Sequence, residues 1–332
     1  MINYVDIVTG LAWGDEAKGK IASTLASTGN YNMVCRWAGG SNAGHTIYHN
    51  NTKYATHIIP CGIFYGIKSI IGPACVLNIE SFYKEIEYLQ LHGFDTSLVK
   101  ISPRTHIVTQ AHLKKDQEKY HKKLGTTAKG IAPCYSDKMA RTGIRAESVI
   151  DKKFLWDENL EGNILCEGAQ GIWLDIDQGN YPYVTSSTTL PYGACSLGFP
   201  TQKIRRIYGA AKIYDTRSGI DPIFPEKLLD DKELKNLATL GAEFGTTTGR
   251  PRKVNWLDLN KLIKSINMTG TTDLIISKID ILKSANKFKI IEDNNLKTFE
   301  NLNSLQFHLE RAVQAQCPLN QTITFSSNPE RI

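Results

Sequence analysis

The sequence predicts an α/β fold with a mostly parallel central sheet, and two observations lead to this prediction. Short runs rich in β-branched residues alternate along the chain with longer segments of helical period. No Pro/Ser-rich linker and no fixed repeat interrupts the 332 residues, so we expect a single domain, residues 1–332, with several inserted loops. The composition, 41% hydrophobic and 22% charged, is that of a folded globular protein.

The expected elements follow from the local patterns. The apolar runs that we expect to form strands are residues 5–8, 33–35, 69–71, 99–101, 163–165, 207–213 and 274–276. The segments expected to be helical are residues 21–26, 79–91, 109–123, 257–266 and 302–315. Lys138, Arg141 and Arg145 have helical spacing, which is typical of a solvated face. Asp175 and Asp177 alternate with apolar residues, so they fit a two-faced strand as well as a metal site.

Charge, cysteine usage and the N-terminus exclude several classes of protein. The net charge of +6 comes from Lys and Arg that are scattered along the chain, which favours small anionic ligands over nucleic acid. No targeting segment and no run long enough to span a bilayer is visible, so we expect no membrane partner and a cytoplasmic location, the host cytoplasm if the chain is viral. Seven cysteines without a C-x-x-C pair argue against a disulfide framework or a zinc site.

The first loop, residues 10–20, has the pattern of a phosphate-binding loop that contains two acids. From Gly14 onward it has the spacing Gly-x4-Gly-Lys of a P-loop, between an apolar run and a helical segment. Ile21 stands where a P-loop has a Ser or Thr that binds magnesium. A triphosphate repels Asp15 unless a divalent cation lies between them or Asp15 takes a proton from a second substrate. Asp15 is therefore the first candidate catalytic residue.

Four further stretches lack a regular period and lie close to apolar runs. They are residues 39–46, 125–130, 167–189 and 244–252. Because loops at the carboxyl ends of parallel strands converge on one crevice, we expect all five loops to form one site.

Each of these loops offers groups that suit a nucleotide or a small acid. His45 provides an acid to act with Asp15, although a lone loop histidine is more often a capping residue. Residues 125–130 suit a phosphate monoester, with an ordinary turn as the alternative. Gln170 suits a purine edge or a phosphate, and Thr185 suits a phosphate. The Thr- and Arg-rich residues 244–252 suit bidentate binding of a small carboxylate.

At these loops the sequence resembles the adenylosuccinate synthetases, GTP-dependent ligases that join L-aspartate to IMP. The motifs occur in the family's order: Trp13-Gly-Asp-Glu-Ala-Lys-Gly-Lys, Asn42-Ala-Gly-His-Thr, Gly125-Thr-Thr, Asp137-Lys-Met-Ala-Arg, Glu167-Gly-Ala-Gln-Gly, Tyr181-Pro-Tyr-Val-Thr-Ser-Ser, Thr247-Thr-Gly-Arg-Pro-Arg and Ser277-Lys-Ile-Asp. A weaker match, Ser326-Ser-Asn-Pro-Glu-Arg, lies where the family closes over the nucleotide base.

The resemblance implies a reaction through a 6-phosphoryl intermediate. Asp15 takes the N1 proton of the purine so that O6 attacks the γ-phosphorus, and His45 acts as general acid at the departing β-phosphate. Lys18 is the third catalytic residue. The amine of aspartate then displaces phosphate from C6. Asp15 and the Gly44 backbone are the implied ligands of Mg²⁺.

The resemblance also implies the binding residues. Those for the purine nucleotide are Asn42, Thr127, Arg141, Gln170, Leu174, Thr185, Ser218 and Gly219, with Arg141 supplied by the neighbouring subunit of a homodimer. Those for aspartate are Thr247, Thr248, Arg250 and Arg252. Those for the donor nucleotide are Gly14, Glu16, Ala17, Lys18, Gly19, Lys20, Gly44, His45, Thr46, Lys278, Asp280, Ser326 and Pro329.

Departures from the common family pattern leave a second acceptor open. Ala38 and Ser41 stand where Gln and His are usual, Ser218 where Val is usual near the ribose, and Asn328 where Gly is usual beside the donor base. Some compact phage relatives act on dGMP, with ATP, dATP or GTP as donor, and make N6-succino-2-amino-dAMP for DNA that contains 2-aminoadenine. That branch often has Ser in place of the loop Asp, so the retained Asp15 favours IMP.

Two other classes remain as alternatives. A P-loop NTPase or kinase would phosphorylate or hydrolyse without aspartate, and Ile21 speaks against it. A nucleotide-sensing or nucleic-acid-binding protein is motivated by the basic charge balance.

Overall fold

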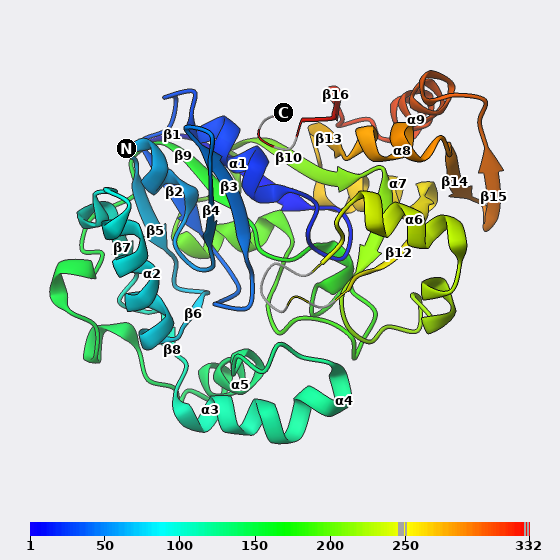
Figure 1. The fold of residues 1–332 in the computed structure, drawn as a ribbon. Coiled ribbons are helices and arrows are strands. Elements are labelled where there is room, and N and C mark those ends of the chain that lie inside the picture. Colours follow the sequence, from blue (N-terminus) through cyan, green and yellow to red (C-terminus); the bar gives the residue numbers. More distant parts are fainter. Residues whose placement is uncertain (245–248, 250, 329, 331) are drawn as a thin grey trace.

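The central feature of the protein is an eight-stranded sheet in which every hydrogen-bonded pair of strands runs parallel (Figure 1). The computed structural model describes residues 1–244, 249, 251–328, 330 and 332. The strand order is β16-β13-β10-β1-β9-β2-β5-β7. The strands are β1 (Ile2–Gly10), β2 (Met33–Arg36), β5 (Lys68–Ile71), β7 (Val99–Ile101), β9 (Gly162–Glu167), β10 (Ile204–Lys212), β13 (Asp273–Ser277) and β16 (Thr322–Ser326). The predicted fold class is confirmed, and the predicted strand runs lie in this sheet except for Ile213, which follows the end of β10.

Smaller sheets complete the fold, and the sequence did not predict them. A four-stranded sheet has the order β11-β12-β14-β15, and two-stranded sheets pair β3 with β4 and β6 with β8. These strands are β3 (His45–His49), β4 (Thr52–Thr56), β6 (Val76–Leu77), β8 (His106–Ile107), β11 (Tyr214–Arg217), β12 (Lys253–Asp258), β14 (Lys289–Glu292) and β15 (Asn295–Thr298).

The helices lie around the central sheet, with α2 towards one end and α6 to α9 towards the other (Figure 1). The helices are α1 (Lys18–Ala26), α2 (Ile79–Leu91), α3 (Gln110–Lys115), α4 (Lys122–Leu124), α5 (Ile131–Ala140), α6 (Lys232–Leu240), α7 (Leu259–Thr269), α8 (Ile279–Ala285) and α9 (Leu302–Gln316). A π-helical turn, Asp116–His121, joins α3 to α4, so the helix predicted over residues 109–123 is present. No described helix is long and apolar enough to cross a membrane.

Three local predictions need correction. Residues 257–258 belong to β12, because Asp258 caps α7 by accepting a hydrogen bond from the Lys261 amide at 3.0 Å, and the helix begins only at Leu259. Helix α5 ends at Ala140, so Lys138, Arg141 and Arg145 do not share a helix face; Arg141 is the left-handed C-cap. Asp175 follows a 3₁₀ turn (Ile172–Leu174) instead of lying in a strand, and its carboxylate accepts the Thr189 amide at 2.6 Å.

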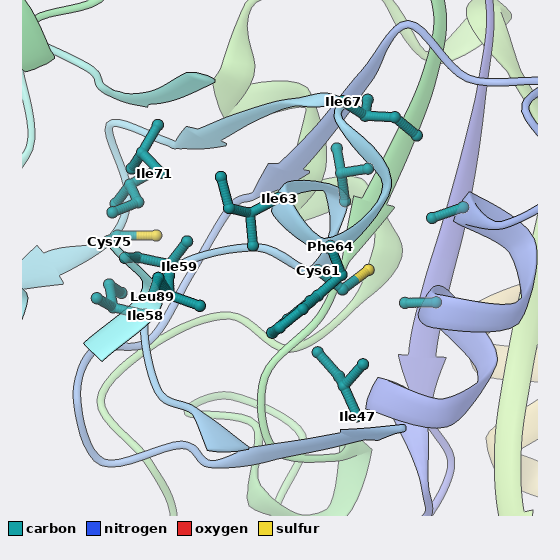
Figure 2. Close-up of a cluster of buried hydrophobic side chains, with 14 of the residues drawn as sticks. Ile47, Ile58, Ile59, Cys61, Ile63, Phe64, Ile67, Ile71, Cys75 and Leu89 are labelled. Carbon is teal, nitrogen blue, oxygen red and sulfur yellow. The ribbon is translucent and has the colours of Figure 1, made fainter. Parts of the chain in front are cut away.

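The core covers both faces of the sheet. Along β1, Val5 and Ile7 belong to one cluster of buried side chains and Val8 to another, as expected for a strand with both faces covered. Figure 2 shows part of the second cluster, where Leu89 from α2 lies near Ile58 and Ile59. All seven cysteines are free thiols within the described chain, and six are buried.

The topology places a crevice at β1. The chain forms β9 on one side of β1 and then crosses to form β10 on the other side. Loops that leave neighbouring strands in opposite directions open a crevice at the carboxyl ends of the strands. The first loop, which follows β1 directly, lies at this point.

Two leucines on α2 provide a matched test of this core. Leu89 is fully buried, whereas Leu91 is 79% exposed. We expect Leu89→Ala to lower the free energy of unfolding by about 2–5 kcal/mol, because it leaves a cavity, and Leu91→Ala to change it by under about 0.5 kcal/mol. Urea unfolding followed by circular dichroism measures both, and equal effects of the two variants would contradict the packing described for α2.

Candidate active site

A pocket of about 890 Å³ lies at the carboxyl ends of the central strands. All five predicted loops contribute to its lining, so the loops converge on one pocket, as predicted from their position after the strands. The predicted site residues that line it are Gly14, Asp15, Ala17, Lys18, Gly19, Lys20, Asn42, Gly44, His45, Thr46, Thr127, Gln170, Leu174, Thr185, Ser218, Gly219, Arg252, Lys278 and Asp280.

The first loop has the backbone shape of an anion-binding loop. Gly14, Asp15 and Ala17 have φ angles of 91°, 62° and 69°, and helix α1 begins at the next residue, Lys18. Alternation of left-handed and ordinary backbone turns amide groups towards one side, and a helix N-terminus adds its dipole. The left-handed conformation costs an Asp or Ala of order 1–3 kcal/mol, which is typical of strain at functional sites.

Glu16 stabilises this loop from the protein interior. Its side chain is fully buried, and Oε1 accepts hydrogen bonds from the amides of Gly14 at 2.7 Å and Ala12 at 3.2 Å. Oε2 accepts a hydrogen bond from Lys18 Nζ at 2.5 Å. The Glu16 carboxylate therefore points into the protein, away from the pocket that Asp15 lines.

Arg252 lies between two carboxylates. Its Nε is 3.0 Å from Asp15 Oδ2, and its Nη1 donates to Glu243 Oε2 at 2.6 Å. Burial alone would lower the pKa of Arg252, but the two carboxylates raise it. The guanidinium is thus fully charged and faces the pocket beside the acid of the first loop.

His45 stands at the start of β3 and lies against a buried ion pair. Its Nδ1 is 3.4 Å from Glu167 Oε1, and the same oxygen is 3.6 Å from Arg36 Nη1. Burial, followed by the charge of Arg36, lowers the pKa of His45, while Glu167 acts in the opposite direction. Burial acts to raise the pKa of Glu167, but His45, Arg36 and the Cys61 amide hold it below its usual range. His45 is therefore neutral at pH 7, beside an ionised carboxylate.

One side of the pocket has the groups expected around a purine nucleotide. Asn42 Oδ1 accepts a hydrogen bond from the Gly40 amide at 3.1 Å, which stabilises the loop of residues 39–46. The Thr185 amide donates a hydrogen bond to the Leu174 carbonyl at 2.7 Å. Gln170 Oε1 and Ser218 Oγ are buried without a hydrogen-bond partner among the described residues. Such atoms are available to a ligand.

The other side of the pocket brings the C-terminal strand to the first loop. Lys20 Nζ donates to Ser326 Oγ at 2.8 Å and to the Asn328 carbonyl at 2.9 Å, and burial lowers the pKa of Lys20 to about 8. Lys278 Nζ donates to the Gly241 carbonyl at 2.7 Å. Ser326 itself is buried and does not line the pocket, which Ser327 and Asn328 reach instead.

Several predicted site residues cannot be placed in the pocket. Thr247, Thr248, Arg250 and Pro329 lie outside the described residues. Arg141 is exposed and does not line the pocket of its own chain.

Part of the pocket lining was not predicted from the sequence. Tyr48, Lys53 and Ala55 reach the pocket from the hairpin of β3 and β4, and Glu243 lies beneath it. The sequence does carry a signal for this hairpin, because an Asn pair between two alternating runs favours a tight hairpin turn. In the structure Asn50 and Asn51 both adopt the positive φ that such a turn requires.

A divalent cation fits in this pocket only if substrate phosphates supply part of its coordination. No cluster of three or more His, Cys, Asp or Glu side chains suited to a metal occurs in the part of the chain that the structure describes. Asp15 and Gly44 both line the pocket. Mg²⁺ is commonly held by one or two carboxylates together with substrate phosphates, so one carboxylate beside an anion-binding loop suits it.

Comparison with known proteins gives a consistent match. The family model described as "Adenylosuccinate synthetase" matches residues 7–163 and 152–323. The adenylosuccinate synthetase of Brevibacillus brevis is 38% identical over 342 residues, covering 86% of this chain and 79% of the relative. That of Lysinibacillus sphaericus is 37% identical over 349 residues, covering 88% of this chain and 80% of the relative.

Two solved structures are similar over nearly the whole chain. The fully ligated adenylosuccinate synthetase of Plasmodium falciparum has a TM-score of 0.83 at 27% identity, covering 99% of this chain and 98% of that one. The succinoaminodeoxyadenylate synthetase of cyanophage S-2L, bound to dGMP and dATP, has a TM-score of 0.74 at 19% identity, covering 99% and 94%. The second likeness shows a common fold.

The buried contact between His45 and Glu167 predicts how the pKa of His45 changes when the carboxylate is removed. Because the Glu167 carboxylate favours the protonated imidazole, Glu167→Gln should lower the pKa of His45 further below 6.5. Selective ¹³C labelling of histidine, with His45→Gln to assign the signal, measures it by NMR. Glu158→Gln, which removes a carboxylate that is 49% exposed and pairs with Lys68, is the control. A rise in the pKa of His45 in Glu167→Gln would contradict the arrangement.

Proposed function

The chain belongs to the adenylosuccinate synthetase family, and we propose that its pocket carries out the ligase reaction in which IMP, L-aspartate and GTP give adenylosuccinate, GDP and phosphate. The observation that carries this proposal is the meeting of three groups in one pocket: Asp15 in the phosphate loop, His45, and the arginine of the Thr- and Arg-rich loop.

Asp15 acts as the base of the first step. A carboxylate in a phosphate-binding loop is placed between the acceptor purine and the donor phosphate, so it takes the N1 proton as O6 attacks the γ-phosphorus. Amides of the loop and Lys18 hold the phosphates. Asp15 and the Gly44 carbonyl would hold Mg²⁺, which when bound neutralises phosphate charge.

His45 serves the departing β-phosphate. Burial keeps it neutral before substrates bind, and an incoming phosphate favours the protonated imidazole. Glu167 orients the imidazole ring of His45 through its contact with Nδ1. Proton donation by His45 therefore follows donor binding.

Arg252, together with Thr247, Thr248 and Arg250, binds aspartate. Guanidinium groups pair with carboxylates through two parallel hydrogen bonds, which fixes the orientation of the amine. Phosphorylation converts O6 from a poor leaving group into a good one, and the amine then displaces phosphate from C6. The ion pair of Arg252 with Asp15 links the binding loop to the base before substrates arrive.

The remaining roles follow the predicted division of the pocket. Asn42, Thr127, Gln170, Leu174, Thr185, Ser218 and Gly219 hold the acceptor nucleotide, and Lys278, Asp280 and Pro329 recognise the donor base, while the buried Ser326 acts through its hydrogen bond with Lys20. Arg141, exposed at the C-cap of α5, reaches the active site of a second subunit in a homodimer. We propose that residues 1–332 form one domain and that the protein works in the cytoplasm.

A second acceptor is supported by one observation. Ser218 lines the pocket, and its hydroxyl is buried without a partner among the described residues, where common members of the family have Val. This added polar group near the ribose or base is compatible with dGMP as acceptor, with ATP, dATP or GTP as donor. The kinase alternative is weakened because Ile21 is fully buried in the core and cannot bind a metal.

Steady-state assays separate these functions. With IMP, aspartate and GTP we expect aspartate-dependent release of phosphate, and Asp15→Asn should lower kcat by about 10²–10⁴-fold because the base is lost. Asp157→Asn, at an exposed position outside the pocket, is the matched control. Turnover of dGMP without any turnover of IMP would identify dGMP as the acceptor in place of IMP. Release of phosphate that does not depend on aspartate would support an NTPase.

A further inference from the structure

Glu243 is a fully buried carboxylate beneath the pocket that has no role in the steps described above. Its Oε2 accepts hydrogen bonds from Arg252 Nη1 at 2.6 Å and from Lys212 Nζ at 3.1 Å. Its Oε1 accepts the Tyr214 hydroxyl at 2.7 Å and lies 4.0 Å from Lys278 Nζ. One carboxylate thus contacts the end of β10, the start of β11 and two cationic residues that line the pocket, Arg252 and Lys278.

The charges around Glu243 make it necessary for the position of Arg252. Lys212 and Arg252 are both buried, with exposures of 4% and 9%, and both contact the same oxygen. Two buried cations that contact one oxygen atom would repel each other strongly in a low dielectric if that oxygen did not carry a negative charge. Burial alone would raise the pKa of Glu243, but Lys212, Arg252 and Tyr214 hold it at about 2, so the carboxylate stays ionised.

The backbone fixes the same pair of residues. The Arg252 amide donates to the Glu243 carbonyl at 3.0 Å, and the adjacent residues Phe244 and Pro251 form a β-bridge. Residues 243 and 252 are thus the two fixed ends of the loop between them. Side chain and main chain of Glu243 together set both the base of the loop and the direction of its arginine.

We propose that Glu243 is a positioning residue for the amino-acid substrate: it holds the Arg252 guanidinium at the pocket wall beside Asp15, where it meets the substrate carboxylate. This rests on the proposed function, because Arg252 is the described member of the aspartate-binding set. A guanidinium that is already oriented loses less side-chain entropy when it pairs with a carboxylate. Glu243 therefore acts on aspartate affinity through Arg252, without contact with the substrate.

The test compares Glu243→Gln with Glu226→Gln. Glu226 pairs with Lys253, the residue after Arg252, but its side chain is 76% exposed. Glu243→Gln should raise the KM for aspartate by about tenfold or more, because the loss of a charged hydrogen bond frees Arg252, and should change the KM of the purine nucleotide by less than about threefold. Glu226→Gln should leave both unchanged.

A double variant separates positioning from simple charge balance. Glu243→Gln leaves Lys212 buried without its anion, which endangers folding, whereas Glu243→Gln/Lys212→Met removes both charges. We expect the double variant to recover the melting temperature of the wild type but to keep the raised KM for aspartate. Recovery of that KM in the double variant, or an unchanged KM in folded Glu243→Gln, overturns the proposal. Absence of aspartate-dependent turnover in the wild type overturns the proposed function itself.

Discussion

Pairing of buried carboxylates with the cations of the pocket is the interaction on which the site depends. The pairs are Glu16 with Lys18, Glu243 with Arg252 and, beside the neutral His45, Glu167 with Arg36. A pocket that binds several anions must gather positive groups, and these repel one another where water is excluded. Each carboxylate offsets that repulsion and at the same time fixes the direction of one side chain. Breaking one pair would leave a buried charge without its partner, so the pairs constrain both stability and geometry.

Sequence reasoning succeeded where a pattern is local and failed where contacts are distant. The strand runs and helix α2, Ile79–Leu91, were predicted because period and length are written in adjacent residues. The glycine-rich loops were found together because parallel strands bring their carboxyl ends to one edge. Glu243 was missed because it precedes the Thr- and Arg-rich loop as an ordinary acid, and only the fold brings Lys212 and Tyr214 to it. β16 was missed because the alternating residues 322–326 become a strand only by pairing with β13.

The first loop shows how strain and packing are combined. Asp15 adopts a left-handed backbone that most residues avoid, and the surrounding contacts hold it there. The loop packs closely against residues 167–189: a Cβ added at Gly10 would lie 2.6 Å from the Gln170 carbonyl, and one at Gly171 would lie 2.4 Å from the Ala12 carbonyl. The two glycines therefore fix the distance between the phosphate loop and the loop assigned to the acceptor. A shift in one loop would be transmitted to the other.

The bond between Lys20 and Ser326 joins residues that are 306 positions apart, at one wall of the pocket. During synthesis the first loop leaves the ribosome long before β16 exists, and N-terminal parts of a chain begin to fold first. A nascent chain therefore carries Asp15 and the phosphate loop without the segment that completes this wall. The wall of the pocket at Lys20 is therefore completed only after residues 322–328 have been synthesised, so this part of the pocket forms late in folding.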